Sequence, residues 1–353
     1  MTVDVVATRG VQLSTDDEER ARRIHASAIV IDGSSVVKQE PAHFDRFRAG
    51  GVTATNHTVT RPSSDLEQSL REINSARRWI AAHPADVLLA TRTSDIETAK
   101  RTDREAIIFG PQNTEFLGTD LHLLGTAYDL GIRVLQLTYQ RQNWVGSGCG
   151  ERRDGGLTSF GRAFVREMNE LGIVVDVSHC GQVTGRDAVD ASRAPVILSH
   201  AHPNAVAPHA RAKDDELIRA IASTGGTIGI TAISMFCYDP QAPRVRPGLA
   251  DFARHLSYLI ELVGVDHVAI GLDFDETNTP EKYAADQAAH PEIYTDTAAF
   301  GWDDRRIHEL THAGETPAVT RALVSLGLSD EDIVKILGGN VMRVFSQVWK
   351  DGR

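Results

Sequence analysis

Cysteine is scarce in this sequence, and long hydrophobic runs are missing altogether. The three cysteines in 353 residues, Cys149, Cys180 and Cys237, fit neither a zinc-finger spacing nor a disulfide framework. No apolar stretch is long enough to span a bilayer, and residues 1–19 are polar and acidic, without the apolar core of a signal peptide. We therefore expect a cytoplasmic protein without a membrane partner.

An excess of positive charge is also lacking. The formal net charge is -11 at pH 7, which argues against nucleic-acid binding and favours a small-molecule substrate. Hydrophobic residues make up 41% of the chain, which is enough for one large core. We expect a single domain over residues 1–353, with residues 1–25 as an N-terminal extension.

Apolar, β-branched segments recur along the chain, and helical patterns separate most of them. Strands that alternate with helices predict a parallel sheet, and eight such units predict a closed, TIM-like (β/α)8 barrel of the α/β class. The predicted strands span residues 29–33, 51–56, 106–113, 133–139, 173–179, 194–201, 226–233 and 267–274. The predicted helices include residues 65–82, 121–130, 161–171, 214–223 and 250–263.

The last part of the sequence carries two further signals. Ser329 followed by Asp332 resembles a capping box that begins a helix, which Gly338-Gly339 would break before a final helix over residues 341–349. The polar, aromatic stretch 275–302 is too long for an ordinary connection. We predict that it forms a lid or rim over the C-terminal mouth of the barrel.

Two histidines end neighbouring predicted strands. His179 closes the run 173–179, and His200 closes the run 195–200. Side chains at the C-terminal ends of adjacent barrel strands converge on one mouth, where catalysis and metal binding occur. Because neutral imidazoles bind zinc well, this pair predicts a metal site.

Further polar side chains follow other predicted strands. Gln112, Tyr139 and Asp273 lie at the ends of the third, fourth and eighth strands, and Arg211 follows His200 after eleven residues. A carboxylate such as that of Asp273 can ligate a metal ion or take a proton from water. A nearby arginine offers two parallel N–H groups to a substrate carboxylate.

Other candidates near the mouth have plainer explanations. His57, His202 and His209 are each interpreted as structural or loop residues, with a functional role as the less favoured reading. Cys149 lies in a glycine-rich loop, but the sequence offers no identifiable base for it. A nucleophilic role for this cysteine is therefore disfavoured.

Longer motifs surround these residues. They are residues 155–162 (GGLTSFGR), 165–169 (VREMN), 176–179 (DVSH), 194–200 (APVILSH), 264–271 (GVDHVAIG) and 338–345 (GGNVMRVF). Together they resemble the renal dipeptidase (membrane dipeptidase) family of zinc metallopeptidases, in its bacterial branch, over nearly the whole chain. The resemblance implies a metal-dependent barrel related to amidohydrolases. It also implies hydrolysis of dipeptides, often with a D-residue on the C-terminal side.

The resemblance implies a role for each of the main candidates. His179 and His200 match the two histidines of the family's second zinc ion. Asp273 matches the catalytic aspartate, which also touches the first zinc ion, and Arg211 matches the arginine that clasps the substrate's carboxylate. Tyr139 falls where the family has a histidine that assists the substrate.

The first zinc site departs from the family pattern. The family's first strand ends in Asp-Gly-His-x-Asp, whereas this segment reads Asp32-Gly33-Ser34-Ser35-Val36, and the bridging glutamate is replaced by Gln112. Valine cannot ligate, a serine hydroxyl is a weak ligand, and glutamine is neutral. Less negative charge therefore faces a cation. Glu115 would compensate only if its loop curls inward.

We therefore expect one zinc ion per chain rather than two. Its ligands would be His179 and His200, with Gln112 and Asp273 completing the site. Weaker binding than in a two-zinc site is expected, because a neutral amide replaces a carboxylate.

The favoured function is metal-dependent hydrolysis of an amide bond in a dipeptide or an N-acyl amino acid. Asp273 would take a proton from water, and Arg211 would bind the substrate's carboxylate. One alternative is an enzyme of the same fold repurposed as a lyase, an isomerase or a biosynthetic enzyme, with Tyr139 as general acid. Another is a non-catalytic descendant that binds a small ligand. Because family members are commonly dimers, the resemblance also implies a homodimer.

Overall fold

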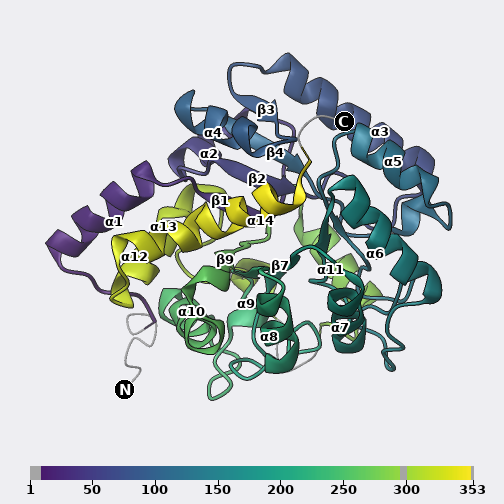
Figure 1. The fold of residues 1–353 in the computed structure, drawn as a ribbon. Helices are drawn as coiled ribbons and strands as arrows, with labels where there is room; N and C mark the ends of the chain where they lie inside the picture. The colour runs from purple at the N-terminus through teal and green to yellow at the C-terminus, as the bar shows by residue number, and fades with distance from the viewer. Residues whose placement is uncertain (1–8, 295–299, 351–353) are drawn as a thin grey trace.

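The computed structural model describes residues 9–294 and 300–350 (Figure 1). Its strands are β1 (Ile31–Val36), β2 (Ala54–His57), β3 (Val87–Leu89), β4 (Glu105–Phe109), β5 (Val134–Gln136), β6 (Val174–Asp176), β7 (Val196–Ala201), β8 (Ile228–Ile230), β9 (Val268–Ile270) and β10 (Phe274–Asp275). They form two five-stranded parallel sheets, in the orders β10-β1-β2-β4-β3 and β5-β6-β7-β8-β9. The predicted α/β class with parallel pairing is confirmed.

The two sheets are joined at both edges. At one edge, β9 pairs with β8 while β10, four residues further along, pairs with β1. At the other edge, Phe109 and Ile132 form a parallel bridge, and the N–H of Gln136 donates to the carbonyl of Pro111 at 3.0 Å. The strands thus follow one another in the order of a TIM-like (β/α)8 barrel.

All eight predicted strands are present, although most are shorter than predicted. Every residue of β4 through β9 is buried, because helices cover their outer face and side chains fill the barrel interior. Burial on both faces explains why these strands read as continuous apolar runs. The three-residue strand β3, which pairs with β4, was not predicted.

The helices are α1 (Thr15–Ser27), α2 (Pro41–Ala49), α3 (Leu66–Ala82), α4 (Thr93–Arg101), α5 (His122–Asp129), α6 (Ser159–Leu171), α7 (Gln182–Ala191), α8 (Asp215–Ser223), α9 (Ser234–Cys237), α10 (Leu249–Val263), α11 (Pro280–Ala289), α12 (Pro317–Ser325), α13 (Asp330–Val334) and α14 (Asn340–Val348). The five helices predicted within the barrel correspond to α3, α5, α6, α8 and α10. Asp65 and Asp214 cap two of them, because each carboxylate accepts a backbone N–H at 2.8 Å.

The glycine pair near the C-terminus does not break the last helix. Ser329 caps α13 as predicted, but the helix continues through a π-helical turn, Lys335–Gly339, into α14. A Cβ atom at Gly338 would lie 2.3 Å from the carbonyl oxygen of Ile29. The prediction of a break was wrong, because this glycine serves close packing against the chain just before β1 rather than a turn.

Helix α14 covers the N-terminal end of the barrel. The Asn340 amide donates to the carbonyls of Val265 and Val268, both at 2.8 Å. The Trp349 indole donates to the carbonyl of Arg133, just before β5, at 3.2 Å. Figure 1 shows α14, in yellow, crossing in front of the strands. The C-terminal strand ends, where the predicted site residues stand, lie at the opposite end.

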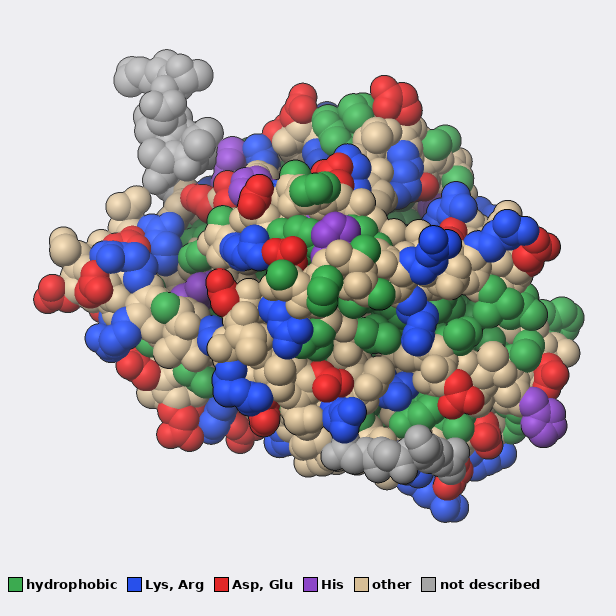
Figure 2. All heavy atoms as spheres, turned by 90° about the horizontal axis from the view of Figure 1, so that it is seen from above, with side chains coloured by type: hydrophobic (Ala, Val, Ile, Leu, Met, Phe, Trp, Pro, Cys, Tyr) green, Lys and Arg blue, Asp and Glu red, His purple; other side chains and the backbone are tan. Residues whose placement is uncertain are grey.

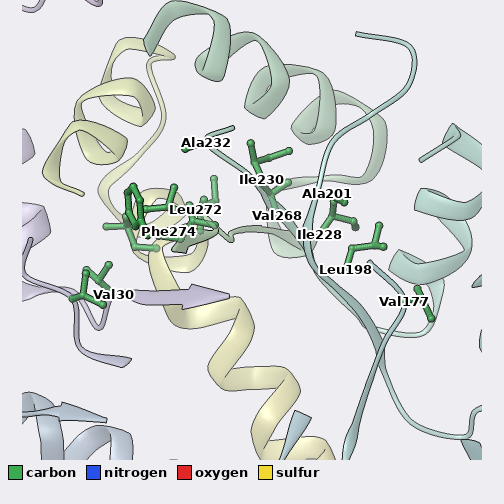
Figure 3. Close-up of a cluster of buried hydrophobic side chains, with 14 of the residues drawn as sticks. Val30, Val177, Leu198, Ala201, Ile228, Ile230, Ala232, Val268, Leu272 and Phe274 are labelled. Atoms are coloured by element: carbon green, nitrogen blue, oxygen red, sulfur yellow. The ribbon is translucent and has the colours of Figure 1, made fainter. Parts of the chain in front are cut away.

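Apolar side chains on β7, β8 and β9 pack outward against the surrounding helices. Leu198, Ile228, Ile230 and Val268 are fully buried in one cluster with Leu256 of α10 (Figure 3). On the surface, acidic and basic side chains are interspersed with hydrophobic ones over the face drawn in Figure 2. Within the described residues, no helix combines the length and the apolar character that a bilayer crossing requires.

Two predicted segments are described in part. The expected N-terminal extension, residues 1–25, contains most of α1, which packs against α12, whereas residues 1–8 lie outside the described residues. The stretch predicted as a lid or rim contains α11, and its residues 295–299 are not described. The single-domain organisation stays a prediction.

Candidate active site

His179 and His200 meet beyond the C-terminal end of β6 and within the last residues of β7. Their Nε2 atoms are 2.9 Å apart, and both side chains are buried. Burial and the nearby charge of Arg211 hold the pKa of both imidazoles well below the ordinary value. Both rings are therefore neutral at pH 7, the form in which an imidazole nitrogen can bind a metal ion.

A β-bulge sets the direction of the second histidine. The register of β7 against β8 shifts around Ser199 and His200. The carbonyl oxygen of Ser199 lies so close to neighbouring strands that Cβ atoms at Gly229 and Gly271 would stand 2.1 Å and 1.8 Å from it. Bulges re-aim side chains beside active sites. Because Gly229 and Gly271 have no Cβ atoms, they leave room for the bulge in β7.

A serine and an aspartate orient the His200 ring. Nδ1 of His200 lies 2.8 Å from Oγ of Ser199, and that hydroxyl donates to the carboxylate of Asp176 at 2.5 Å. Because the hydroxyl gives its only proton to the carboxylate, its oxygen accepts the Nδ1–H of His200. Nε2 of His200 is left with a lone pair directed at His179. Contacts of this kind fix ring orientation and tautomer at metal sites.

Gln112 belongs to a hydrogen-bonded network with Ser34 and Asp273, which align with ligands of the first zinc ion in the family pattern. Its amide donates to Oγ of Ser34 at 3.1 Å and to Oγ1 of Thr58 at 2.9 Å. Ser34 in turn donates to a carboxylate oxygen of Asp273 at 3.3 Å. These side chains thus bind one another, and among the four of them only Asp273 can carry a charge.

Asp273 combines an unusual backbone conformation with a shifted pKa. Its φ of 58° lies in the left-handed region, which residues other than glycine seldom adopt. Its N–H donates to the carbonyl of Ser34 at 2.9 Å, and Arg306 donates to the carbonyls of Leu272 and Asp273. Burial raises the pKa of the carboxyl group to about 6, against the lowering effect of Arg306. The group is therefore mostly ionised at neutral pH, yet ready to accept a proton.

Tyr139 lies directly beside the histidine pair. Its ring stacks on that of His179, with 4.3 Å between centroids, and His290 approaches it edge-on at 6.3 Å. Burial and the negative charge of Asp273 raise the pKa of the phenol, which therefore keeps its proton. Because His290 directly follows α11, this part of the predicted rim segment reaches the mouth.

Arg211 is buried against the backbone at the two histidines. Its terminal nitrogens donate to the carbonyls of Ser178 and His200, the second at 3.2 Å. Its Nε atom is buried without a hydrogen-bond partner among the described residues. The guanidinium group of Arg211 thus already donates hydrogen bonds to the protein backbone, and binding of a substrate carboxylate by Arg211 stays a prediction.

Two of the less favoured histidines make structural contacts. Nδ1 of His57 accepts the N–H of Val37 at 3.2 Å, and burial lowers the pKa of this imidazole to about 4. Nε2 of His209 lies 2.8 Å from the carbonyl oxygen of Ile293, so this ring ties the loop after β7 to the rim segment. Neither ring is part of the pair described above.

As far as the structure describes the chain, the side chains of the remaining candidates form no hydrogen bond with the two imidazole rings, although the N–H of Cys149 donates to the carbonyl of His179 at 2.8 Å. Burial raises the pKa of the Cys149 thiol, which argues against a nucleophilic thiolate. His202 is buried, and neither of its ring nitrogens has a partner in the described part of the chain. Glu115 is exposed and accepts from the Asn113 amide at 3.3 Å, so its loop does not curl inward.

The histidine pair fits one metal ion, whereas the surrounding residues do not fit two. Two converging neutral imidazoles supply ligands that zinc prefers. Within residues 9–294 and 300–350, however, no group of three or more His, Cys, Asp or Glu side chains is placed to hold a metal ion. Further ligands would have to come from water, a neutral amide such as that of Gln112, or the substrate, and such a site binds weakly.

Sequence reasoning missed three residues that shape this site. Ser199 and Asp176 stand inside the motifs quoted above, where each precedes a histidine by one or three residues. That spacing was a usable signal. Arg306 follows Asp273 by 33 residues, and no sequence pattern connects them.

The sequence of this chain is similar to known proteins over most of its length. A family model described as membrane dipeptidase, peptidase family M19, matches residues 18–313. Dipeptidase aclJ of Aspergillus oryzae is 28% identical over 289 residues, which cover 80% of this chain and 61% of that protein. The chain therefore spans about three fifths of that relative's length.

Solved structures resemble the fold closely. An amidohydrolase from Pseudomonas aeruginosa is 31% identical, with a TM-score of 0.85 over 93% of this chain and 99% of that one. A metallo peptidase from Rhodobacter sphaeroides, liganded with a phosphinate mimic of the dipeptide L-Ala-D-Ala, has a TM-score of 0.77 over 92% of this chain and 100% of that one. At 21% identity, the second likeness concerns the fold alone.

Proposed function

Because the chain belongs to the membrane dipeptidase family, peptidase family M19, we propose that it hydrolyses an amide bond in a dipeptide or an N-acyl amino acid with the help of one zinc ion. The observation that carries this proposal is the convergence of His179 and His200 at 2.9 Å between Nε2 atoms. The orientation of His200 by Ser199 supports it, because a lone pair on Nε2 is what a metal ion needs.

In this mechanism, the chain supplies a metal holder and a base. Zinc held by the two histidines would polarise the scissile carbonyl and lower the pKa of water. Asp273, ionised at neutral pH, accepts a proton as the water oxygen bonds to the carbonyl carbon. That proton then passes to the amine nitrogen as the C–N bond breaks. The contacts of Ser34 and Arg306 with its backbone hold Asp273 in place.

Two further residues would position the substrate. Tyr139 keeps its proton and can donate a hydrogen bond to the substrate. The charge of Arg211 and its unpartnered Nε–H would attract the substrate's carboxylate. Residues 275–302 would cover the bound molecule, since His290 already contacts Tyr139. We also propose a homodimer in the cytoplasm, as the resemblance and the sequence led us to expect.

Metal content and hydrolysis of L,L- and L,D-dipeptides by the purified protein test this proposal together. We expect one zinc ion per chain, loss of activity with a chelator, and recovery when zinc is restored. His200→Ala should abolish both binding and activity, whereas His122→Ala, on an exposed position of α5, should change neither. Undiminished hydrolysis by the metal-free protein would overturn the proposal.

A second candidate function is supported by the network of Gln112, Ser34 and Thr58. Ser34 and Gln112 align with ligands of the family's first zinc ion but bind each other as neutral side chains, which favours chemistry other than peptide hydrolysis, such as a lyase, isomerase or biosynthetic step on an amino-acid-like substrate. Tyr139 would then be the general acid. Metal binding without hydrolysis would support this alternative, and full activity of Tyr139→Phe would remove that role. A protein with neither metal nor activity would be a non-catalytic binder.

A further inference from the structure

Helix α11, in the segment predicted to form a rim, turns one face toward the candidate active site. Tyr283, Asp286 and His290 stand at positions i, i+3 and i+7, which share one side of a helix. Tyr283 is buried, and its phenol donates to the carbonyl of Phe300 at 3.0 Å. The N–H of His290 donates to the carbonyl of Asp286 at 3.0 Å, so the helical turn between them is intact. Because the ring of His290 lies 6.3 Å from that of Tyr139, this face of α11 reaches the mouth.

Asp286 is neither sealed in the core nor turned to open solvent. It is half-buried, as are Gln287 and His290, whereas the opposite side of α11 is exposed. The exposed residues are Glu281, Lys282, Ala284, Ala285, Ala288 and Ala289. A ligand can therefore reach the carboxylate of Asp286. Partial shielding from water strengthens the attraction between such a carboxylate and a cation.

The charge of Asp286 acts on the side chains of the mouth. Burial raises the pKa of the Tyr139 phenol most, and the negative charges of Asp273 and Asp286 raise it further. The same two carboxylates also raise the pKa of Tyr294, in addition to its burial. Because interactions between charges fade with distance, Asp286 lies on the same side of the mouth as Tyr139 and Asp273.

Asp286 has no cationic partner in the part of the chain that the structure describes. Lys282, one turn earlier on α11, binds Asp275 instead, at 3.1 Å. Residues 295–299, which follow the described part of the rim, contain no basic side chain. Partial burial raises the pKa of the Asp286 carboxyl group, and the charge of Lys282 offsets this only in part. A cation bound to Asp286 would lower that pKa and stabilise the ionised form.

The other carboxylates at the mouth are already matched. Arg306 donates to the backbone carbonyl of Asp273, and its positive charge lowers the pKa of that carboxyl group against the effect of burial. Glu292 lies 3.2 Å from Nδ1 of His290. Asp286 is thus the carboxylate of this region that is left for a positively charged group of a ligand.

From this placement we propose that Asp286 binds the α-ammonium group of a dipeptide and thereby selects dipeptides over N-acyl amino acids. The inference rests on the proposed function, in which Arg211 attracts the carboxylate end of the substrate. A dipeptide carries its one backbone cation at the other end, roughly 7 Å away. The bond between ammonium and carboxylate is charge-assisted, and about twice as strong as a neutral hydrogen bond. An N-acyl amino acid has no such cation and leaves Asp286 without a partner.

Titration calorimetry on the zinc-supplied protein tests this inference with two compounds. One is a phosphinate mimic of L-Ala-D-Ala, and the other is its des-amino analogue, in which hydrogen replaces the ammonium group. We expect the wild type to bind the first about tenfold more tightly. Asp286→Asn should remove this preference by weakening the binding of the amino compound alone. Glu281→Gln removes the same charge from the exposed side of α11 and should keep the preference.

Thermal unfolding would establish that both variants are folded, and Asp286→Glu should retain part of the preference. An unchanged preference in Asp286→Asn, equal affinity of the wild type for the two compounds, or binding of neither would overturn the inference. None of these readouts depends on hydrolysis. An inactive protein that loses the preference in Asp286→Asn would contradict the proposed function alone. An active enzyme whose preference survives that substitution would contradict this inference alone.

Discussion

Replacement of Ser199 by alanine is the most direct test of how this site holds a metal ion. The hydroxyl stands between Nδ1 of His200, at 2.8 Å, and the carboxylate of Asp176, at 2.5 Å. Alanine removes the acceptor of the Nδ1–H group inside a fully buried environment. The ring is then free to turn or to move its proton to Nε2, where a proton blocks the metal.

The size of the effect follows from these contacts. Loss of a group that orients a ligating histidine costs about 10–100-fold in metal affinity, or about 1.4–2.7 kcal/mol. A buried N–H left without an acceptor costs about 1–3 kcal/mol in folding stability. Because Ser199 makes two short hydrogen bonds at once, we expect both losses in the same variant.

Zinc affinity can be measured by competition with a chromogenic chelator, and the tautomer of His200 by nitrogen NMR of the imidazole. Ser178→Ala is the control, because that hydroxyl also donates to Asp176 at 2.5 Å and accepts the backbone N–H of His200 at 3.2 Å, but within the described residues it forms no hydrogen bond with a histidine ring. We expect a change of zinc affinity and tautomer in Ser199→Ala alone. Equal affinity in Ser199→Ala and the wild type, or equal losses in both serine variants, would refute the reasoning.

Other expected outcomes concern the base, the metal, pH and packing. Asp273→Asn should lower kcat/KM by about 10²–10⁴-fold, and wild-type activity should fall as the pH drops through about 6; a flat profile would exclude this base. Gln112→Glu should tighten zinc binding, and an unchanged dissociation constant would mean that residue 112 is not a ligand. Burial lowers the pKa of His43, but the carboxylates of Glu105 and Glu276 outweigh it and raise this pKa from 6.5 to about 9. The protonated imidazole therefore stabilises the fold by about 3 kcal/mol below pH 6.5, and chemical denaturation should show this contribution disappear as the pH rises through 9. Gly338→Ala places a methyl group 2.3 Å from the Ile29 carbonyl oxygen and should lower the free energy of unfolding by about 1–3 kcal/mol, as measured by calorimetry. Gly327→Ala is the comparison, because Gly327 has a φ of +72° and open space around it, so that variant reports backbone strain without crowding.

The barrel could be predicted because its strands are buried on both faces. Their continuous apolar runs mark each strand position, although hydrogen-bonded pairing stops earlier than the apolar run does. Strand β3, Val87–Leu89, was not predicted, because three residues are too few to show a hydrophobic periodicity. Gly338 was misread because its close contact is with Ile29, about three hundred residues earlier, and local sequence does not report such a neighbour.

The histidine pair could be predicted because both residues follow recognisable strands. The structure brings them together, while their metal-binding role stays a prediction. The hydrogen bonds from Arg211 to the carbonyls of Ser178 and His200 could not be predicted, since they depend on where two separate strands end. The same holds for Arg306, whose contact with Asp273 exists only in the folded chain.

The pairing of β1 with β10 also governs the order in which the barrel can be completed during synthesis. Ser35 lies opposite Phe274, 239 residues later in the chain. At about 5–20 residues per second, a ribosome needs roughly 10–50 s to supply the second partner. Throughout that interval one edge of β1 is without its neighbour, and an unpaired strand edge is a template for aggregation. The nascent chain therefore exposes one edge of its first strand long before that strand meets its last one.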